Sequence, residues 1–501
     1  MSWLRHVLAT SFAALLCAGC STLVPPLVTV GPDYKKPTTA IEQGALPDAG
    51  FVTDEHTDSG ELAVARRGQD PRKAITIADL DAWWRHFNDP LLTELIERAT
   101  TNNLSYAIAQ ERLEQARWAY SGSFGSLLPA LGVGGSVAQN EWHKDTSTAK
   151  AGGRDIHRNS YHGGFDMTWE IDIFGGQRRA NEAAKAAMEA EFYSVDAAYV
   201  SLTAEIGAQY VTLRTTQQRI KTARANLKLQ NETYEILKAR LDSGIGDELA
   251  VSQAKYNVDR TRSAIPPLQA RAEELMNALA ILAGDMPGTW QARLAQMPDR
   301  DWLLEPQKLA EIPLDAIRSR PDVRAAERLL AAQVASVGVS KSMLFPKFYL
   351  NGSLGLDSVK ATDFLHRSAL YSSIGPSFSW PIFRGGAVYA DYKAAESKMD
   401  EAAMNYELAI QTALGEVRNS YSAYTHTYHT FKSLTGAVEA AGAAVDISKD
   451  LYKNGLADFN NVLDAQRSKL NLEDSLNIAR GDISLDLIRL YKSLGGGLAQ
   501  Q

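Results

Sequence analysis

Polar and apolar residues alternate along four short stretches of the chain. The clearest is FDMTWEIDIFGG, residues 165–176, whose odd positions are apolar up to Ile173 and whose even positions are acidic or hydroxyl-bearing up to Asp172. Similar alternation begins near Leu131, Phe348 and Ile374. A period of two indicates a β-strand with one apolar and one polar face. We therefore predict strands at about 131–141, 162–174, 347–357 and 373–383.

Two much longer stretches have a helical composition. Residues Arg178 to about Leu241 and Val388 to about Lys453 are rich in Ala, Leu, Glu, Lys, Gln and Arg, and proline is absent from 131–265 and from 382–501. At about 1.5 Å per residue, either stretch would reach roughly 95 Å as one helix. Such lengths predict coiled-coil-like helices or a helical tube. Between them, Pro266-Pro267 predicts a restart or kink.

The second half of the chain repeats the first. TWEIDIFGGQRRANEAAKAAMEA (168–190) is similar to SWPIFRGGAVYADYKAAESKMDEA (379–402), and LDSGIGDELAVSQAK (241–255) to YKNGLADFNNVLDAQR (452–467). The period of about 210 to 217 residues is too long for a solenoid unit and implies two copies of one module. We expect an N-terminal extended segment at 20–88, a first repeat at 89–300, a second repeat at 301–495 and a short tail at 496–501.

The first twenty residues have the features of an export signal. Arg5 precedes the short apolar run VLATSFAALL, and Ala18-Gly19-Cys20 resembles a bacterial lipobox. Cys17 stands where that pattern prefers Leu, and an ordinary signal peptide cut at a small residue is the alternative. We predict a lipoprotein signal peptide at 1–19, with Cys20 as the N-palmitoyl and S-diacylglycerol cysteine. Ser21, by the same resemblance, favours transfer to the outer membrane.

Four strands leave the sheet incomplete. After residue 20 no run of eighteen apolar residues occurs, so no transmembrane helix is expected. A barrel needs about eight strands, and an open sheet in lipid would leave its edge groups unpaired. Either the sheet packs on helices in a soluble fold, or several chains pool their strands. Two chains would give eight strands and three would give twelve.

Several segments together resemble the TolC-like outer-membrane efflux lipoproteins of the NodT type. They are VGPDYKKP, DAWWRHFNDPLLTELIERA, the IFGG and IFRGG turns, LYKNGLADFNNVLDAQR and LYKSLGGG, and they cover nearly the whole mature chain in order. The resemblance implies a mainly α protein with membrane β-structure. It implies a homotrimer in which four strands per chain form a twelve-stranded barrel in outer-membrane lipid, above a periplasmic α-barrel.

The same resemblance implies a function. Such proteins are passive exit ducts that carry small toxic compounds from the periplasm to the exterior. They dock to a periplasmic adaptor, or membrane fusion protein, and to an inner-membrane resistance-nodulation-division transporter. Two alternatives stay open: the duct of a type I protein-secretion system, and a soluble periplasmic coiled-coil scaffold.

The segment NNVLDAQR, residues 460–467, holds the candidate pore residues. Asp464 and Arg467 are three apart and share a helix face, so they could simply be an exposed intrahelical pair. In the resembled family this segment forms the periplasmic constriction, with an Asp at the position of Asp464 in the pore and, in some members, an Arg at that of Arg467. A gate residue falls at Asn460 or Asn461, where relatives often have Leu or Asp. A ring of three Asp464 carboxylates would favour cations.

The turns that precede the return helices are the candidate docking sites. Gly244 and Gly455 end long helices as C-cap glycines would, and Asp247 and Asp458 follow them. The resemblance implies that these turns face the adaptor.

Other functions find little support. The net charge of −7 gives no reason to expect nucleic acid. The chain has no Gly-Lys-Ser/Thr phosphate loop and no G-x-S-x-G motif, and its only cysteines are Cys17 and Cys20. We therefore predict no enzyme, no cofactor and no metal site.

Overall fold

The protein is described from a computed structural model, which covers residues 28–37, 82–143, 145, 155–298 and 314–496. These residues form two compact units. Unit 1 comprises residues 28–37, Leu113–Ala190 and Ala326–Tyr406, and unit 2 comprises the remaining described residues. Each unit draws on both halves of the chain, so the sequence repeat and the spatial units divide the protein differently.

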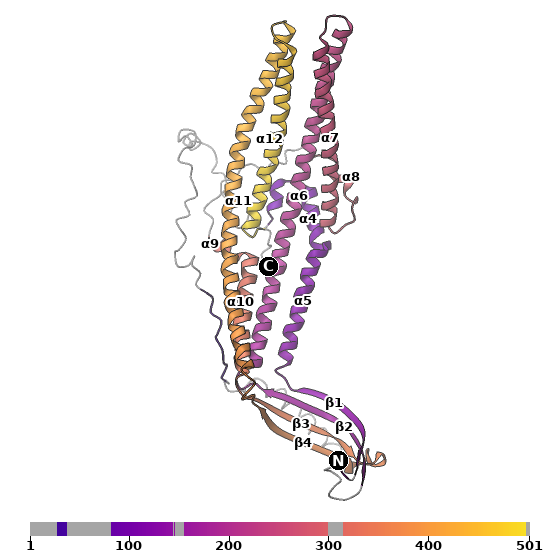
Figure 1. Cartoon of the computed structure of the whole chain (residues 1–501), viewed down its shortest axis with the longest axis vertical. Helices are drawn as coiled ribbons and strands as arrows, with labels where there is room; N and C mark the ends of the chain where they lie inside the picture. The colour runs from indigo at the N-terminus through magenta and orange to yellow at the C-terminus, as the bar shows by residue number, and fades with distance from the viewer. Residues whose placement is uncertain (1–27, 38–81, 144, 146–154, 299–313, 497–501) are drawn as a thin grey trace. The chain divides into compact units, whose positions relative to one another are not determined.

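Four strands and nine α-helices, with three 3-10 turns, make up the described part of the chain (Figure 1). The strands are β1 (Ala130–Trp142), β2 (Ile156–Ile171), β3 (Lys347–Ser358) and β4 (Leu370–Ser379). The 3-10 turns are η1 (Trp83–Phe87), η2 (Ala361–Asp363) and η3 (Arg367–Ala369). The shorter helices are α4 (Pro90–Asn102), α5 (Leu104–Gly125), α8 (Gln291–Leu294), α9 (Leu314–Ser319) and α10 (Pro321–Ser342). The longer ones are α6 (Gly176–Asp242), α7 (Glu248–Leu282), α11 (Ala387–Lys453) and α12 (Phe459–Ser493).

The sheet lies in unit 1 and is antiparallel throughout, in the order β1-β2-β3-β4. Its register places Val133, Phe165 and Leu354 side by side on one face. All three side chains are exposed, and so are Ile374 and Phe378 on the same face of β4. The opposite face is polar because the alternating residues follow the pleat. The predicted two-faced strands are confirmed, and the large apolar side chains named here on one face are exposed among the described residues.

Two strand ends differ from the prediction. β2 ends at Ile171, and the next residue, Asp172, turns its carboxylate to accept the N–H of Arg178 at 2.9 Å. β4 ends at Ser379, which pairs with Lys347, the first residue of β3. The predicted continuation of these strands to 174 and 383 is therefore wrong. β2 also begins earlier than predicted, at Ile156.

The long helices match the sequence closely. α6 and α11 each have 67 residues without a break, as their composition predicts. α7 also runs without a restart, although it contains Pro266 and Pro267, so the predicted restart is wrong. The carbonyls that lose their partners belong to the exposed residues Arg262 and Ser263, where water can satisfy them.

Aromatic residues anchor the start of unit 2. Trp83 is buried, stacks on the buried Tyr491 of α12 with ring centroids 5.8 Å apart, and packs against Gly207 of α6. Asp89 caps α4 by accepting the N–H of Leu91 at 2.9 Å, as its place before Pro90 predicts. The η1–α4 segment is thereby fixed to both α6 and α12.

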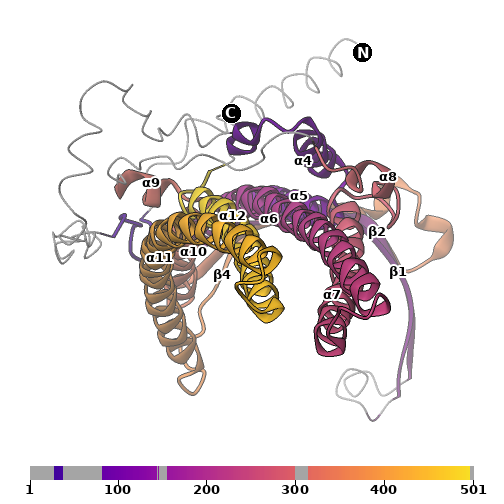
Figure 2. The same cartoon turned by 90° about the horizontal axis from the view of Figure 1, so that it is seen from above.

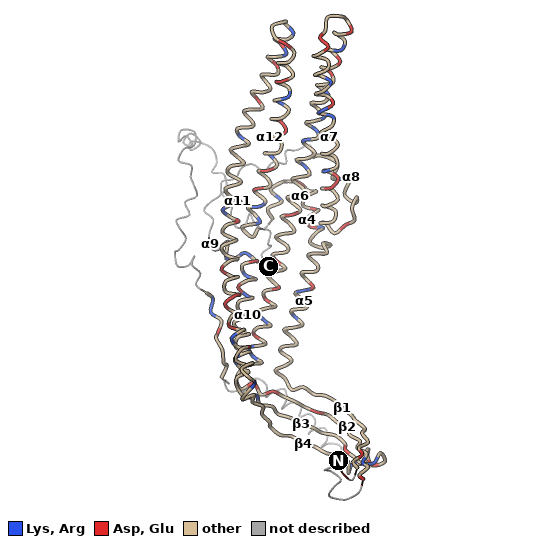
Figure 3. The backbone as a smooth tube through the Cα atoms, viewed as in Figure 1, with Lys and Arg blue, Asp and Glu red and all other residues tan. Residues whose placement is uncertain are grey.

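Charge is distributed unevenly. Figure 3 shows acidic and basic residues along the helices of unit 2, whereas the strands of unit 1 carry few of them. β4 contains no charged residue and β1 contains only Glu141. None of the helices in the described part of the chain combines the length and apolarity needed to cross a membrane.

Candidate functional site at the hairpin turns

Two helical hairpins carry the candidate residues. The first hairpin is α6–α7, joined by residues 243–247, and the second hairpin is α11–α12, joined by residues 454–458. Figures 1 and 2 show each return helix running back alongside its outgoing helix within unit 2. The candidate turn and pore residues all lie in this unit.

Both turns end the outgoing helix in the same way. Gly244 has φ +75° and Gly455 has φ +71°, in the left-handed region that glycine adopts without steric cost. In each turn the N–H of the residue after the glycine donates to a carbonyl five residues back, at 3.1 Å in the first and 2.9 Å in the second. This is the Schellman arrangement, and the predicted role of the two glycines as helix C-caps is confirmed.

The two aspartates that follow differ in their contacts. Asp247 is the N-cap of α7, and its carboxylate accepts the N–H of Leu249 at 2.9 Å. Asp458 precedes α12 with an extended backbone, but its side chain accepts no capping hydrogen bond. Both aspartates are exposed. Their carboxylates are available at the surface of the turns.

Apolar side chains join the two hairpins just behind the turns. The buried cluster consists of Leu237, Ala250 and Ala254 from the first hairpin and Phe459, Val462 and Leu463 from the second. Arg240 adds a polar contact, because its Nη1 donates to the Tyr452 hydroxyl at 3.0 Å. The two turns are therefore held beside each other within one chain.

The structure brings Asp464 and Arg467 together on α12. Arg467 Nη1 lies 3.4 Å from Asp464 Oδ1, and the Asp464 side chain is 73% exposed. Arg467 Nη2 also lies 3.4 Å from the Asn257 amide oxygen of α7. Asn460 and Asn461 are exposed, and neither side chain forms a hydrogen bond with a described residue. Asp464 thus offers a charge that its single long contact leaves largely unneutralised.

The polar contacts between α6 and α12 were not predicted from the sequence. Arg219 binds Asp474 through two hydrogen bonds of 2.7 and 2.9 Å. One turn farther along α12, Asn477 donates to the Thr222 hydroxyl at 3.0 Å. These partners are about 255 residues apart, and no local pattern marks them. They tie the first hairpin to the second.

Cys20 and the signal peptide fall outside the described residues. Among the residues that the structure describes, no group of three or more His, Cys, Asp or Glu could hold a metal ion.

A family model, curated relatives and solved structures all show that this chain is similar to outer-membrane proteins. The model of a family described as "Outer membrane efflux protein" matches residues 95–285 and 312–496. "Nodulation protein T" of Rhizobium leguminosarum bv. trifolii is 30% identical over 463 residues, which cover 92% of this chain and 90% of that protein. "Pyoverdine export outer membrane protein OpmQ" of Pseudomonas aeruginosa is 28% identical over 427 residues, covering 84% of this chain and 88% of that protein. The solved structure of the outer-membrane channel OprN superimposes with a TM-score of 0.81 at 32% identity, covering 93% of this chain and 99% of that one.

Proposed function

This chain belongs to the outer membrane efflux protein family, and from that premise we propose that three copies form the exit duct of a tripartite pump. As a member of the family it is an outer-membrane channel and the outer-membrane component of an efflux system. Small toxic compounds are the proposed cargo.

The observation that carries the proposal is the unfinished sheet. β1 and β4 are outer strands of the four-stranded sheet, so each has one edge without a partner strand among the described residues. In lipid each unpaired backbone group would cost several kcal/mol. Val133, Phe165 and Phe378 expose large apolar side chains on one face, which suits contact with lipid. Pairing of β1 with β4 of the next copy would remove every edge.

Engineered cysteines can test that pairing. The chain has no cysteine after Cys20, so new thiols report without background. Val133→Cys is combined in turn with cysteine at each of residues 370–379, and the oxidised protein is run on a non-reducing gel. We expect one register to give a covalent species of three chains that a reductant dissolves. As a control, Val133→Cys with Phe165→Cys, which are paired within one chain, should give only monomers. Covalent species no larger than two chains would contradict the trimer.

We further propose that Asp464 and Arg467 line the constriction of the duct, with Asn460 and Asn461 beside them. The exposed Asp464 carboxylate supports this role, since a ring of three would favour cations. Asp464→Ala should lower cation preference and change single-channel conductance in planar bilayers. Asp450→Ala is the matched control, because Asp450 is also 73% exposed and faces Lys453 three residues on. Unchanged conductance and selectivity in Asp464→Ala would remove Asp464 from the constriction.

We propose that the two exposed turns contact the periplasmic adaptor. We propose that the third protein of the pump is an inner-membrane resistance-nodulation-division transporter. Gly244 and Gly455 adopt positive φ in the two turns. The aspartates that follow them, Asp247 and Asp458, are both exposed. A photo-crosslinking residue at 247 or 458 should capture the adaptor in cells that express the pump. The same residue at the exposed Thr435, far along α11 from the turn, serves as control.

Lipid attachment at Cys20 is proposed from the sequence. Cells fed labelled palmitate should label the native protein, and Cys20→Ser should abolish the label. Label retained in that variant would contradict the assignment.

A further inference from the structure

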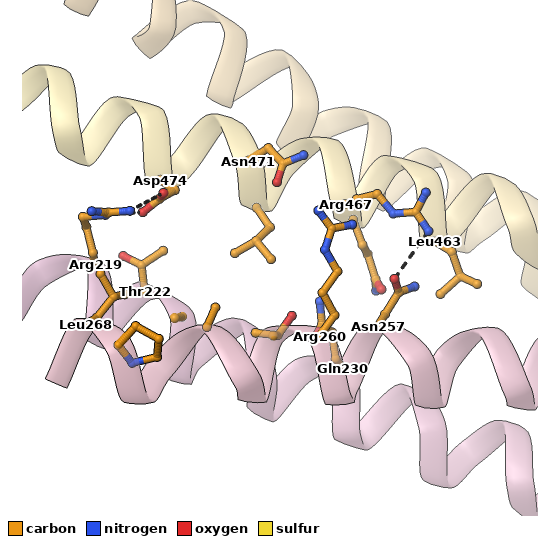
Figure 4. A pocket seen from close by; sticks show the side chains of 16 residues that line it. Arg219, Thr222, Gln230, Asn257, Arg260, Leu268, Leu463, Arg467, Asn471 and Asp474 are labelled. Carbon is orange, nitrogen blue, oxygen red and sulfur yellow. Dashed lines mark hydrogen bonds and ion pairs between the residues drawn. The ribbon is translucent and has the colours of Figure 1, made fainter. Parts of the chain in front are cut away.

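A cavity of about 370 Å³ lies between the two hairpins, behind the turns. Residues of α6 and α7 line one side of it, and residues of α12 line the other. The Arg219–Asp474 ion pair closes one end, and the Arg467–Asn257 hydrogen bond marks the other (Figure 4). Arg260 reaches from α7 toward α12 between these ends. All of these residues belong to unit 2.

The cavity has more positive charge than its own residues neutralise. Three guanidinium groups line it, from Arg219, Arg260 and Arg467, against the single carboxylate of Asp474. That carboxylate is engaged by Arg219 through two short hydrogen bonds. The Arg260 guanidinium forms no hydrogen bond or ion pair with a described residue. Its donors are available to a ligand.

The guanidinium of Arg467 has only weak hydrogen-bond partners. Its two contacts, to Asp464 and Asn257, are both 3.4 Å long. Its Nε is buried and has no partner among the described residues. A guanidinium presents its N–H groups as a planar fork that fits carboxylate, sulfonate or phosphate oxygens. Arg260 and Arg467 therefore offer two such forks from opposite sides of the cavity.

The rest of the lining is suited to an organic body rather than a bare ion. Ala264, Pro267, Leu463 and Leu470 supply apolar surface. Gln230 is buried, and its amide oxygen has no partner among the described residues, so it could accept a hydrogen bond from a ligand. Small-molecule sites typically combine apolar walls with a few polar groups in cavities of about 300–1,000 Å³.

We propose that this cavity binds one amphiphilic organic anion per chain, such as an aromatic carboxylate, sulfonate or phosphate monoester. The acidic group lies between Arg260 and Arg467, and the apolar body lies against Pro267 and Leu470. Because Arg260 belongs to the first hairpin and Arg467 to the second, the bound anion joins the two hairpins. The site does not depend on the proposed role of Asp464 in conduction.

The test uses the full-length protein in a non-ionic detergent at low ionic strength, with 1-naphthalenesulfonate as the probe. Isothermal titration calorimetry should show saturable binding, with a detergent blank subtracted. Arg260→Gln should weaken binding by at least about tenfold, since it removes a charge-assisted hydrogen bond. Arg262→Gln is the matched control, because Arg262 lies on the same helix, is exposed and pairs with Asp259 at 2.9 Å.

Two further measurements test whether the probe binds inside the cavity and whether binding requires its acidic group. Ala264→Phe should abolish binding by filling the cavity, and 2-naphthol, which lacks the acidic group, should bind at least about tenfold more weakly than the sulfonate. No saturable binding by the native protein would overturn the proposal. So would equal affinities of Arg260→Gln and Arg262→Gln, or equal affinities for the sulfonate and 2-naphthol. Unchanged circular dichroism of each variant ensures that a loss of binding reflects the site.

Discussion

The two hairpins share a backbone plan and differ in chemistry. Their outgoing helices, α6 and α11, both have 67 residues, and their return helices, α7 and α12, both have 35. Both turn on a glycine with positive φ, followed three residues later by an aspartate. The repeat in the sequence thus specifies the same hairpin twice.

Side chains at equal distances from the two turn glycines are not the same. Where α12 has Asp464 and Arg467, α7 has Gln253 and Tyr256, and where α12 has Asn477, α7 has Pro266. Asn477 donates across to α6, which a proline ring cannot do. Helix length and turn shape are therefore common to both hairpins. The Asp464–Arg467 pair and the hydrogen bond donated by Asn477 belong to the second hairpin alone.

The largest expected effect comes from separating the two hairpins at their shared apolar cluster. Leu237→Ala should lower the free energy of unfolding by about 2–4 kcal/mol, because it leaves a cavity next to Phe459 and Val462. Urea titration followed by circular dichroism, at fixed protein concentration, measures the change. Leu456→Ala, in a turn where Leu456 is 75% exposed, should change it by less than about 0.5 kcal/mol. Equal effects of the two variants would mean that the hairpins do not depend on this cluster.

The turn glycines should show how alike the hairpins are. Gly244→Ala and Gly455→Ala should each cost about 1–2 kcal/mol in the same urea titration, because both residues have positive φ. Gly436→Ala, in the interior of α11 with open space around it, should instead stabilise by about 0.5–1 kcal/mol. A cost at only one of the two turns would show that their common shape is not equally needed.

The capping aspartates should distinguish the hairpins. Asp247→Ala should cost about 1 kcal/mol, because it removes the hydrogen bond to the N–H of Leu249. Asp458→Ala should cost clearly less, because its side chain accepts no such bond. Asp247→Asn should restore most of the loss. A larger loss of unfolding free energy in Asp458→Ala than in Asp247→Ala would contradict this difference between the two turns.

The smallest expected effect depends on pH. Burial, and then the charge of Asp486, raise the pKa of the Asp482 carboxyl above its ordinary value of 3.8. The folded state therefore favours protonated Asp482, and this contribution to stability is lost as the pH rises from about 4 through the raised pKa. Asp482→Asn should raise the melting temperature at pH 7.5 and change it little at pH 4 or below. Arg271, at the equivalent place in α7, is exposed and pairs with Glu274, so Arg271→Gln should show no such pH dependence.

Much of the fold was predictable because its signals are local. Composition and missing prolines located α6 and α11, a period of two located the strands, and Gly244 and Gly455 marked the helix ends. The strand ends were harder, since β2 stops where Asp172 accepts an N–H of the next helix and β4 stops opposite Lys347, where its partner strand β3 begins. Pro266 and Pro267 do not restart the helix, because solvent can satisfy the carbonyls of an exposed helix face.

The candidate site likewise contains one contact that the sequence predicted and one that it did not. The pairing of Asp464 with Arg467 followed from their spacing of three on one helix. The hydrogen bond between Arg467 and Asn257 did not, because Asn257 lies 210 positions away in the chain.

By itself the sequence determined the two equal hairpins, their glycine turns and a sheet with one apolar face, since each depends on residues a few positions apart. Only the tertiary structure decided which side chains of α12 meet those of α6 and α7. It joined Arg219 to Asp474 and left Arg260 and Arg467 with donors to spare around one cavity. Such contacts depend on how two helices are rotated and shifted against each other, and the periodicity of a single helix does not fix either quantity.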